Sequence, residues 1–110
     1  MPAVPRKPTD FEGRVYQVLR GVPPGRVTTY GALARRVGAG SARAIGQALR
    51  RNPFAPEVPC HRVIRADLTP GGYSGATSGP ELGRKLALLA GEGVRFDAAG
   101  RLRERWRLWE

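Results

Sequence analysis

The spacing of apolar residues predicts two helices in the first third of the chain. Segment 9–12, Thr-Asp-Phe-Glu, has the spacing of a capping box, and apolar residues then recur at helical intervals as far as Gly21. A Pro-Pro-Gly turn follows. The pattern then predicts a short helix over 30–37, for which Thr28 or Thr29 is the expected N-terminal cap.

A third helix is predicted after the Gly-Ala-Gly turn at 38–40, because Ser41 is suited to cap it and apolar residues share one face as far as Arg51. A short helix, a glycine turn and a capped second helix together form a helix-turn-helix. Four outward positions of the second helix are long and polar: Arg43, Gln47, Arg50 and Arg51. Its remaining positions are small: Ala42, Ala44 and Gly46.

The small residues of this helix favour one kind of DNA contact. A helix that enters the major groove uses long polar side chains to touch base edges. Small residues instead let the backbone approach closely, which suits the narrower minor groove with one or two long side chains as wedges. Close packing inside the protein would require the same small residues, so the pattern alone leaves both interpretations open.

The second half of the chain alternates loops with one longer helix. An Asn-Pro pair at 52–53 ends the third helix, 62–64 is expected to be extended, and 69–75 is a glycine-rich loop. A second capping-box arrangement at 78–81 begins a helix that ends near 92–93. Its apolar face is expected to consist of Leu82, Leu86 and Leu89.

The last residues change from helical spacing to alternation. Segments 94–96 and 101–103 flank a turn, which suggests a small hairpin, and Trp106 and Leu108 are expected to face inward. Contact of Trp109 or of the tail's arginines with DNA is the alternative to packing on the domain.

These elements predict an α/β fold: a mostly helical single domain with a winged-helix-like helix-turn-helix and a small C-terminal β-hairpin. Residues 1–8 are rich in proline and basic residues and are expected to be disordered. Residues 9–92 are expected to form the DNA-binding and active-site domain, and 93–110 a tail packed on it.

The charge of the chain favours a polyanionic partner. Its net charge is +10, and 17 of the 19 basic residues are arginine, whose guanidinium suits phosphate. Between Glu12 and Glu57 there is no acidic residue but there are eight arginines. We therefore expect nucleic acid as the partner, the alternative being a solvated basic face.

Cysteine content and hydropathy indicate the compartment. A single cysteine forms no internal disulfide and supplies no multi-thiolate metal site, which fits a reducing environment. No apolar run has membrane-spanning length, and no signal peptide is evident. We expect a cytoplasmic, nucleoid-associated or nuclear protein that is not secreted.

The pentapeptide Pro59–Val63 contains the only cysteine and the only histidine of the chain, Cys60 and His61. A thiol beside an imidazole pairs a nucleophile with a base, and a free thiol, with a pKa of about 8.5, needs such activation. Adjacent side chains of an extended strand point to opposite faces. His61 therefore serves Cys60 only through a tight turn or a water. A lone cysteine that packs as a small buried hydrophobe is the alternative.

Five segments occur in an order that resembles the C-terminal domain of O6-alkylguanine-DNA alkyltransferases, from about Phe11 to Glu92. They are VTTYG at 27–31, ARAIG at 42–46, RNP at 51–53, PCHRVI at 59–64 and GYSG at 72–75. The resemblance implies a repair protein that moves an alkyl group from guanine O6 irreversibly to its own cysteine. It implies double-stranded DNA containing O6-alkylguanine as partner, a monomer, and no cofactor or metal.

The resemblance also implies a role for each matching residue at the reaction centre. Cys60 would accept the alkyl group, and His61 would deprotonate it through a bound water. Glu92 would orient His61, and Asn52 would brace the turn that holds the pentapeptide. Glu92 follows a helix C-terminus, where a carboxylate is slightly unfavourable for the helix dipole.

Other matching residues would handle the DNA. Tyr30 would crowd a phosphate and help rotate the nucleotide outward, because a stacked base hides its O6 substituent. Arg43 would fill the gap in the duplex. The remaining DNA contacts would come from Ala42, Ala44, Gly46, Gln47, Arg50 and Arg51. The backbone carbonyls of Cys60 and Val63 would hold the guanine amine, and Tyr73 and Ser74, with Tyr30, would close the base pocket.

The sequence departs from that family in several places. It has no counterpart of the family's separate N-terminal domain, Ala76 stands where a second glycine is usual, extra residues precede Lys85, and Gln47 replaces a smaller residue. The tail and the stretch 56–58 look more like alkyltransferase-like proteins, which sense and flip alkylguanine but usually carry Trp in place of the acceptor cysteine.

Two further interpretations follow from these departures. A lesion sensor would recruit nucleotide-excision repair factors with little or no transfer, although Cys60 argues against it. A helix-turn-helix transcription regulator is the third interpretation, and the small residues of the second helix argue against that one.

Overall fold

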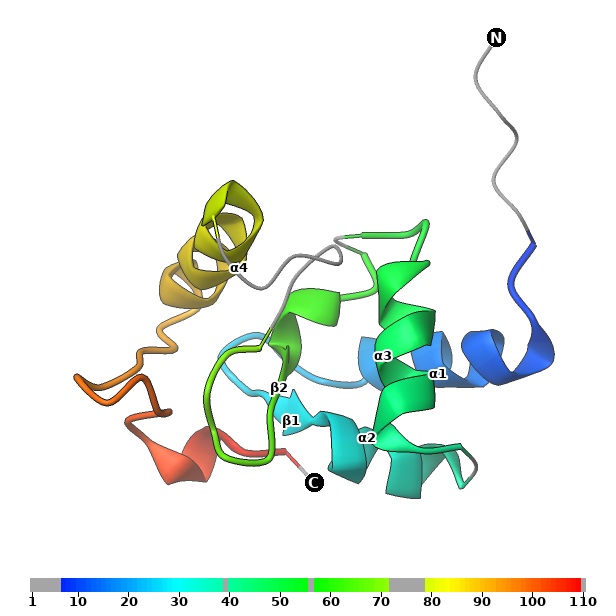
Figure 1. Cartoon of the computed structure of the whole chain (residues 1–110), viewed down its shortest axis with the longest axis horizontal. Coiled ribbons are helices and arrows are strands. Elements are labelled where there is room, and N and C mark those ends of the chain that lie inside the picture. Colours follow the sequence, from blue (N-terminus) through cyan, green and yellow to red (C-terminus); the bar gives the residue numbers. More distant parts are fainter. Residues whose placement is uncertain (1–6, 39, 56, 72–78, 110) are drawn as a thin grey trace, which may run out of the picture.

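A computed structural model describes residues 7–38, 40–55, 57–71 and 79–109. In these ranges the chain forms four α-helices: α1 (Asp10–Arg20), α2 (Tyr30–Val37), α3 (Ala42–Arg50) and α4 (Gly79–Gly91). The strands β1 (Thr28–Thr29) and β2 (Val63–Ile64) pair in parallel, with Thr28 opposite Val63. Two 3₁₀ turns, η1 (Cys60–Arg62) and η2 (Arg105–Arg107), complete the fold, which is mostly helical as expected (Figure 1).

The helix starts follow the caps that the sequence predicts. Thr9 and Glu12 form a reciprocal capping box: Thr9 Oγ1 accepts from the Glu12 amide at 3.1 Å, and Glu12 Oε1 accepts from the Thr9 amide at 3.0 Å. Thr29, not Thr28, caps α2 by accepting from the Ala32 amide at 3.1 Å. Ser41 caps α3 in the same way. These bonds satisfy amides that a helix leaves open at its first turn.

The turn between α2 and α3 depends on glycine. Gly40 has a φ of +79°, a left-handed conformation that L side chains rarely adopt. A Cβ atom there would lie 2.8 Å from the ring of Phe11 on α1. Glycine is therefore required both by the backbone and by the contact that holds the helix-turn-helix against α1.

One hydrophobic cluster joins α1, α2 and α3. Its fully buried members include Val15, Leu19, Val22, Leu33, Ile45, Val58 and Val63. Within it, the Tyr16 hydroxyl donates to the carbonyl of Ala48 at 2.7 Å, so the one polar atom of that ring is satisfied inside the core.

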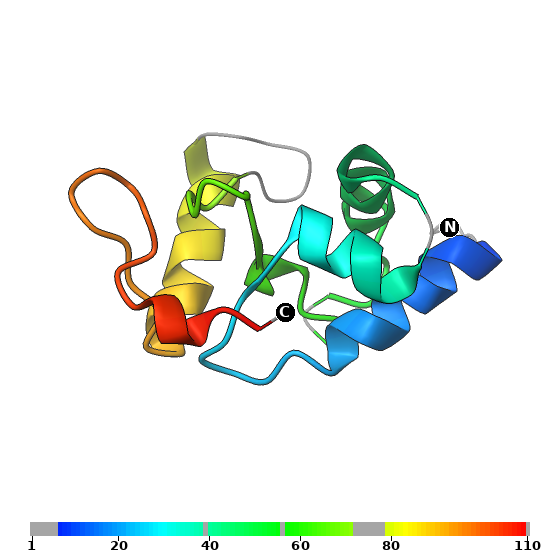
Figure 2. The ribbon, with the colours of Figure 1, turned by 90° about the horizontal axis from the view of Figure 1, so that it is seen from below.

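A second cluster lies on the other side of the strand pair. It consists of Val27, Ile64, Leu89, Val94 and Leu102. Figures 1 and 2 show α4 on one side of β1 and β2, and α1, α2 and α3 on the other. Val63 and Ile64 are neighbours in β2 but enter different clusters, because successive side chains of a strand point to opposite faces. The short sheet therefore connects both halves of the core.

The tail returns to β1. Phe96 and Leu102 form one antiparallel bridge, which is the whole extent of the predicted hairpin pairing. The Val27 amide donates to the Arg107 carbonyl at 2.8 Å, and the Trp109 amide donates to the Val27 carbonyl at 2.6 Å. Residues 105–109 thus pack along the segment that enters β1.

The prediction that Trp106 faces inward is wrong. Its side chain is 61% exposed, and the Arg107 guanidinium lies 4.3 Å from its ring centroid. The alternation used for the prediction requires an extended strand, whereas Arg105–Arg107 forms the 3₁₀ turn η2.

No helix among the described ranges has the length and apolarity needed to cross a membrane.

Candidate active site

The pentapeptide forms a tight turn, one of the two arrangements under which His61 serves Cys60. Pro59 precedes η1, and the Arg62 amide donates to the Pro59 carbonyl at 2.9 Å. Cys60 begins the turn, is half-buried and packs against the cluster formed by α1, α2 and α3. The turn ends where β2 begins.

Asn52 spans the loop that leads into this turn. Its side-chain amide donates to the Val58 carbonyl at 3.0 Å, and its side-chain oxygen accepts from the Phe54 amide at 2.9 Å. Both bonds lie within the connection between α3 and the pentapeptide, residues 51–58. Its predicted bracing role is compatible with this geometry.

His61 is buried, with a side chain only 3% exposed, and its Nε2 lies 3.1 Å from Oε2 of Glu92. Burial lowers the pKa of His61 below 6.5, although the contact with Glu92 opposes the change. The imidazole is therefore neutral at pH 7. With Nε2 donating to the carboxylate, Nδ1 is the atom that carries the lone pair, and it has no hydrogen-bond partner among the described residues.

Glu92 follows α4 directly and is also held by the guanidinium of Arg62. Arg62 donates to Oε1 at 3.0 Å through Nε and to Oε2 at 2.6 Å through Nη2. Its Nη1 donates to the Val22 carbonyl at 2.9 Å. Burial alone would raise the pKa of Glu92, but hydrogen bonds from Arg62 and His61 lower it overall. The carboxylate is thus ionised where it meets the imidazole, and Arg62 is a site residue that the sequence analysis missed.

Lys85 is the second missed residue. It is fully buried on α4, and its Nζ donates to the carbonyls of Val63 at 2.7 Å and Pro70 at 2.6 Å. Burial lowers its pKa to about 8, while the charge of Cys60 opposes the change and that of Arg65 adds to it. Lys85 lies three residues after Leu82 and four before Leu89, so the helical stripe that predicts the apolar face also passes through it.

The Val63 carbonyl, predicted to hold the guanine amine, is therefore already an acceptor for Lys85. The Cys60 carbonyl accepts from the Val63 amide within the 3₁₀ turn. A carbonyl oxygen has two lone pairs, so each retains one acceptor direction. Tyr73 and Ser74, the other predicted pocket residues, lie outside the described residues.

Tyr30 and Arg43 line one groove. It holds about 490 Å³ and is bounded also by Gly31, Ala42, Gly46, Arg65 and Ala66. Burial raises the pKa of the Tyr30 phenol, Arg65 lowers it, and the charge of Cys60 raises it further. The charge of Cys60 raises the pKa of both Tyr30 and Lys85, so the thiol lies within electrostatic range of both side chains. The sequence analysis did not predict Arg65 as a residue of this groove, because no local pattern marks a single residue that follows a strand.

The predicted DNA-binding positions of α3 share one surface. Ala42, Arg43, Gln47 and Arg50 are exposed, and Ala44 and Gly46 are half-buried. A Cβ atom on Gly46 would meet no described atom within 4 Å, so internal packing does not explain this glycine. Ala44, by contrast, lies close to the turn, since a Cβ atom built on Gly40 would come within 3.3 Å of the Ala44 Cβ. Close approach to DNA is therefore the better explanation for Gly46, and close packing inside the protein is the better explanation for Ala44.

Arg51 belongs partly to the fold. It follows α3, is exposed, and its Nη1 lies 3.7 Å from Oε2 of the buried Glu12. Glu12 also completes the capping box of α1. The guanidinium of Arg51 is therefore engaged with α1.

Comparison with known proteins gives the family. Residues 10–94 match the family model described as 6-O-methylguanine DNA methyltransferase, DNA binding domain. The chain belongs to this family, as the resemblance of its five segments implies. A methylated-DNA–protein-cysteine methyltransferase of Mycobacterium leprae is 50% identical over 82 residues, which are 74% of this chain and 47% of that protein. A DNA base-flipping protein of Thermus thermophilus is 47% identical over 93 residues, 79% of this chain and 59% of that protein.

Solved structures include both kinds of relative. Schizosaccharomyces pombe Atl1, in complex with damaged DNA containing O6-carboxymethylguanine, has a TM-score of 0.76 and 30% identity and covers 96% of this chain and 99% of its own. Mycobacterium tuberculosis OGT in complex with DNA has a TM-score of 0.65 and 43% identity over 79% of this chain and 51% of its own. The chain thus spans about half the length of the methyltransferases that it matches.

Proposed function

We propose that this chain is a DNA repair protein that binds duplex DNA through α3, turns an O6-alkylguanine out through the minor groove, and transfers its alkyl group to Cys60. The observation that carries the proposal is the site around this cysteine. A half-buried thiol lies on a tight turn, and the next residue is a buried, neutral imidazole that contacts an ionised carboxylate. The charge of the same cysteine acts on the buried Lys85. A purely structural cysteine requires none of these groups.

Activation of the thiol uses the polar network. His61 takes the Cys60 proton on Nδ1, through one water, and Glu92 stabilises the imidazolium that results. Arg62 keeps Glu92 in place and ionised. The positive charge of Lys85 favours the thiolate.

Transfer is a single displacement. The thiolate sulfur attacks the alkyl carbon, a carbon–sulfur bond forms, and the bond between that carbon and guanine O6 breaks. The electron pair leaves with the guanine, which takes up a proton and is restored. The thioether on Cys60 is stable, so each protein molecule acts once, as a monomer and without a cofactor or metal.

Access to the base depends on the groove beside α3. Gly46 and Ala42 let the helix approach the DNA closely, and Arg43 is the long side chain that fills the space left by the nucleotide. Tyr30, at the start of α2, lines this groove and crowds the phosphate of the displaced nucleotide. Unstacking costs a few kcal/mol, which such a wedge offsets.

The test is the mass of the protein after incubation with a duplex that contains O6-methylguanine. The expected result is one added methyl group on the peptide that contains Cys60, with none on Cys60→Ser. An unmodified wild-type protein that nevertheless binds the lesion would exclude transfer.

One observation favours a second function, lesion sensing. The likeness to S. pombe Atl1 extends over 96% of this chain and includes the tail, whereas the likeness to M. tuberculosis OGT covers 79%. A sensor would bind and flip O6-alkylguanine and recruit nucleotide-excision repair factors. Cys60→Ala would then keep the full preference for lesion DNA, and the wild type would acquire no methyl group.

A further inference from the structure

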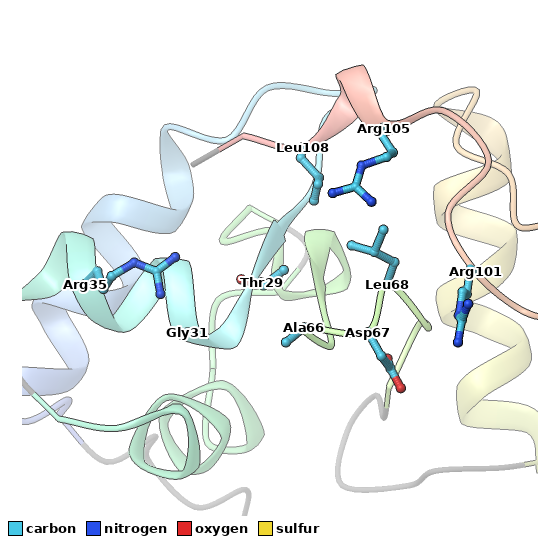
Figure 3. Close-up of a pocket in the computed structure, with 9 residues that line it drawn as sticks. All are labelled: Thr29, Gly31, Arg35, Ala66, Asp67, Leu68, Arg101, Arg105 and Leu108. Carbon is cyan, nitrogen blue, oxygen red and sulfur yellow. The ribbon is translucent and has the colours of Figure 1, made fainter.

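A hollow lined by three arginines lies between the start of α2, the loop after β2 and the C-terminal tail. Arg35 comes from α2, Arg101 from the turn of the tail, and Arg105 from η2 (Figure 3). Figure 3 shows Arg35 and Arg105 extending toward each other from two sides of this hollow, with Leu108 and Leu68 close to Arg105 and with Arg101 at the far edge. Its volume is about 430 Å³. We call it the arginine hollow.

Backbone hydrogen bonds place these arginines. The Leu102 amide donates to the Leu68 carbonyl at 2.9 Å, which ties the segment after Arg101 to the loop that follows β2. The bonds between Val27 and the tail hold η2, and with it Arg105, against β1. The guanidinium groups therefore project from a fixed backbone, which lowers the entropy lost when they bind a ligand.

The charge of the arginine hollow is positive. Three guanidinium groups line it, against the single carboxylate of Asp67. Oδ1 of Asp67 already accepts from the Thr69 amide at 3.0 Å and from the Thr69 hydroxyl at 2.6 Å. The lining thus attracts an anion, and planar guanidinium groups match the oxygens of a phosphate.

The arginine hollow is continuous with the groove beside α3. Gly31 and Ala66 line both of them. Gly31 is the second residue of α2 and has no side chain to separate the two spaces, and Ala66 has only a methyl group. A polyanion that lies along Arg43 and Tyr30 can therefore continue past these two residues to Arg35 and Arg105.

We propose that the arginine hollow binds a backbone phosphate of the DNA beyond the base pairs covered by α3, and so extends the DNA-binding surface onto the C-terminal tail. The inference rests on the proposed function, because it assumes that DNA occupies the groove at Tyr30 and Arg43. Continuity with that groove favours DNA over an acidic protein segment as the occupant.

The salt dependence of DNA binding tests this assignment. Each phosphate contact contributes about 0.9 to the slope of log affinity against log salt concentration. The double variant Arg101→Gln, Arg105→Gln is expected to lower that slope by about 0.9 for a duplex containing O6-methylguanine. The matched control, Arg14→Gln with Arg84→Gln, removes the same charge from exposed positions on α1 and α4, and should leave the slope near that of the wild type.

A second measurement leaves the protein unchanged. Single phosphates of the duplex are replaced by neutral methylphosphonates, one position at a time. Wild-type protein should lose affinity at one position outside the α3 site, and the double variant should lose nothing further there. Equal slopes for wild type and variant, or equal sensitivity at every position, would overturn the arginine hollow as a phosphate site. Absence of any lesion preference in the wild type would overturn the proposed function instead.

Discussion

The Nε2 atom of His61 lies 3.1 Å from Oε2 of Glu92, although 31 residues separate the two in the chain. The same carboxylate receives two hydrogen bonds from Arg62, the residue next to His61. Glu92 thus holds two consecutive residues of the pentapeptide from the end of α4. The proton of the neutral imidazole is therefore on Nε2 because the fold brings Glu92, a residue distant in sequence, into contact with that nitrogen.

Replacing Glu92 with Gln should slow alkyl transfer by about 10- to 100-fold, because a hydrogen bond to a charged group contributes about 1.5–3 kcal/mol. Lesion affinity should change little, since Glu92 does not line the groove beside α3. Single-turnover transfer rates check the prediction. Glu81→Gln, which removes a carboxylate from the exposed first turn of the same helix, is the control. Equal rates for Glu92→Gln and the wild type would contradict it.

Between pH 6.5 and about 7.5, where Lys85 keeps its proton, the transfer rate should show no loss from protonation of His61, and that loss should appear only below pH 6.5. Burial lowers the pKa of His61 below that ordinary value, so the base remains neutral until the solution is more acidic. Glu92 remains charged throughout this range, because its pKa lies below 4.5. Rates measured in a series of buffers at constant ionic strength check this. A decline that starts above pH 6.5 would be inconsistent with a buried neutral imidazole.

The same shift makes stability depend on pH. His61 takes up a proton at a higher pH in the unfolded chain than in the folded protein, so its contribution is present above 6.5 and is lost as the pH falls through the folded value. The free energy of unfolding of the wild type should therefore decrease below pH 6.5, measured by urea denaturation. His61→Phe should show a smaller decrease over the same interval. Parallel curves for the two proteins would refute this assignment.

Replacing Lys85 with Met should slow the reaction of Cys60 with iodoacetamide by about fivefold below pH 8, because a nearby positive charge favours the thiolate. The difference between variant and wild type should disappear above pH 8, where the lysine has lost its proton. Alkylation rates across this range provide the measurement. A constant ratio at every pH would mean that Lys85 acts only through its bonds to the Val63 and Pro70 carbonyls.

Gly46 offers a test of the approach to DNA. Gly46→Ala should stabilise the fold by up to about 1 kcal/mol, because alanine has the higher helix propensity and its Cβ meets no described atom. Gly46→Gln should keep this stability but weaken binding of lesion DNA at least tenfold, on the order of 1.4 kcal/mol. Gly83 on α4 has equally open surroundings, so Gly83→Gln is the matched control and should bind DNA normally. Unimpaired binding by Gly46→Gln would exclude a close contact at this position.

Local patterns predicted most of the framework. The capping box at Thr9, the cap at Ser41 and the glycines of the turn act within a few residues, and the structure has the helices where these signals place them. The pairing of Cys60 with His61 is also evident from the sequence, because the two residues are adjacent. Trp106 shows the limit of such patterns, since one 3₁₀ turn is enough to reverse the direction of a side chain.

By itself, the sequence determined where helices begin and end and which residue is the proposed nucleophile, since capping and covalent neighbourhood act over a few positions. Only the tertiary structure decided the surroundings of that nucleophile. Lys85 is buried because α4 packs beside β2, where the carbonyls of Val63 and Pro70 accept hydrogen bonds from its ammonium group. Glu92 is ionised and fixed because Arg62 reaches it across the fold. Burial and charge at a site depend on segments that are distant in sequence, and no local pattern records which of them will meet.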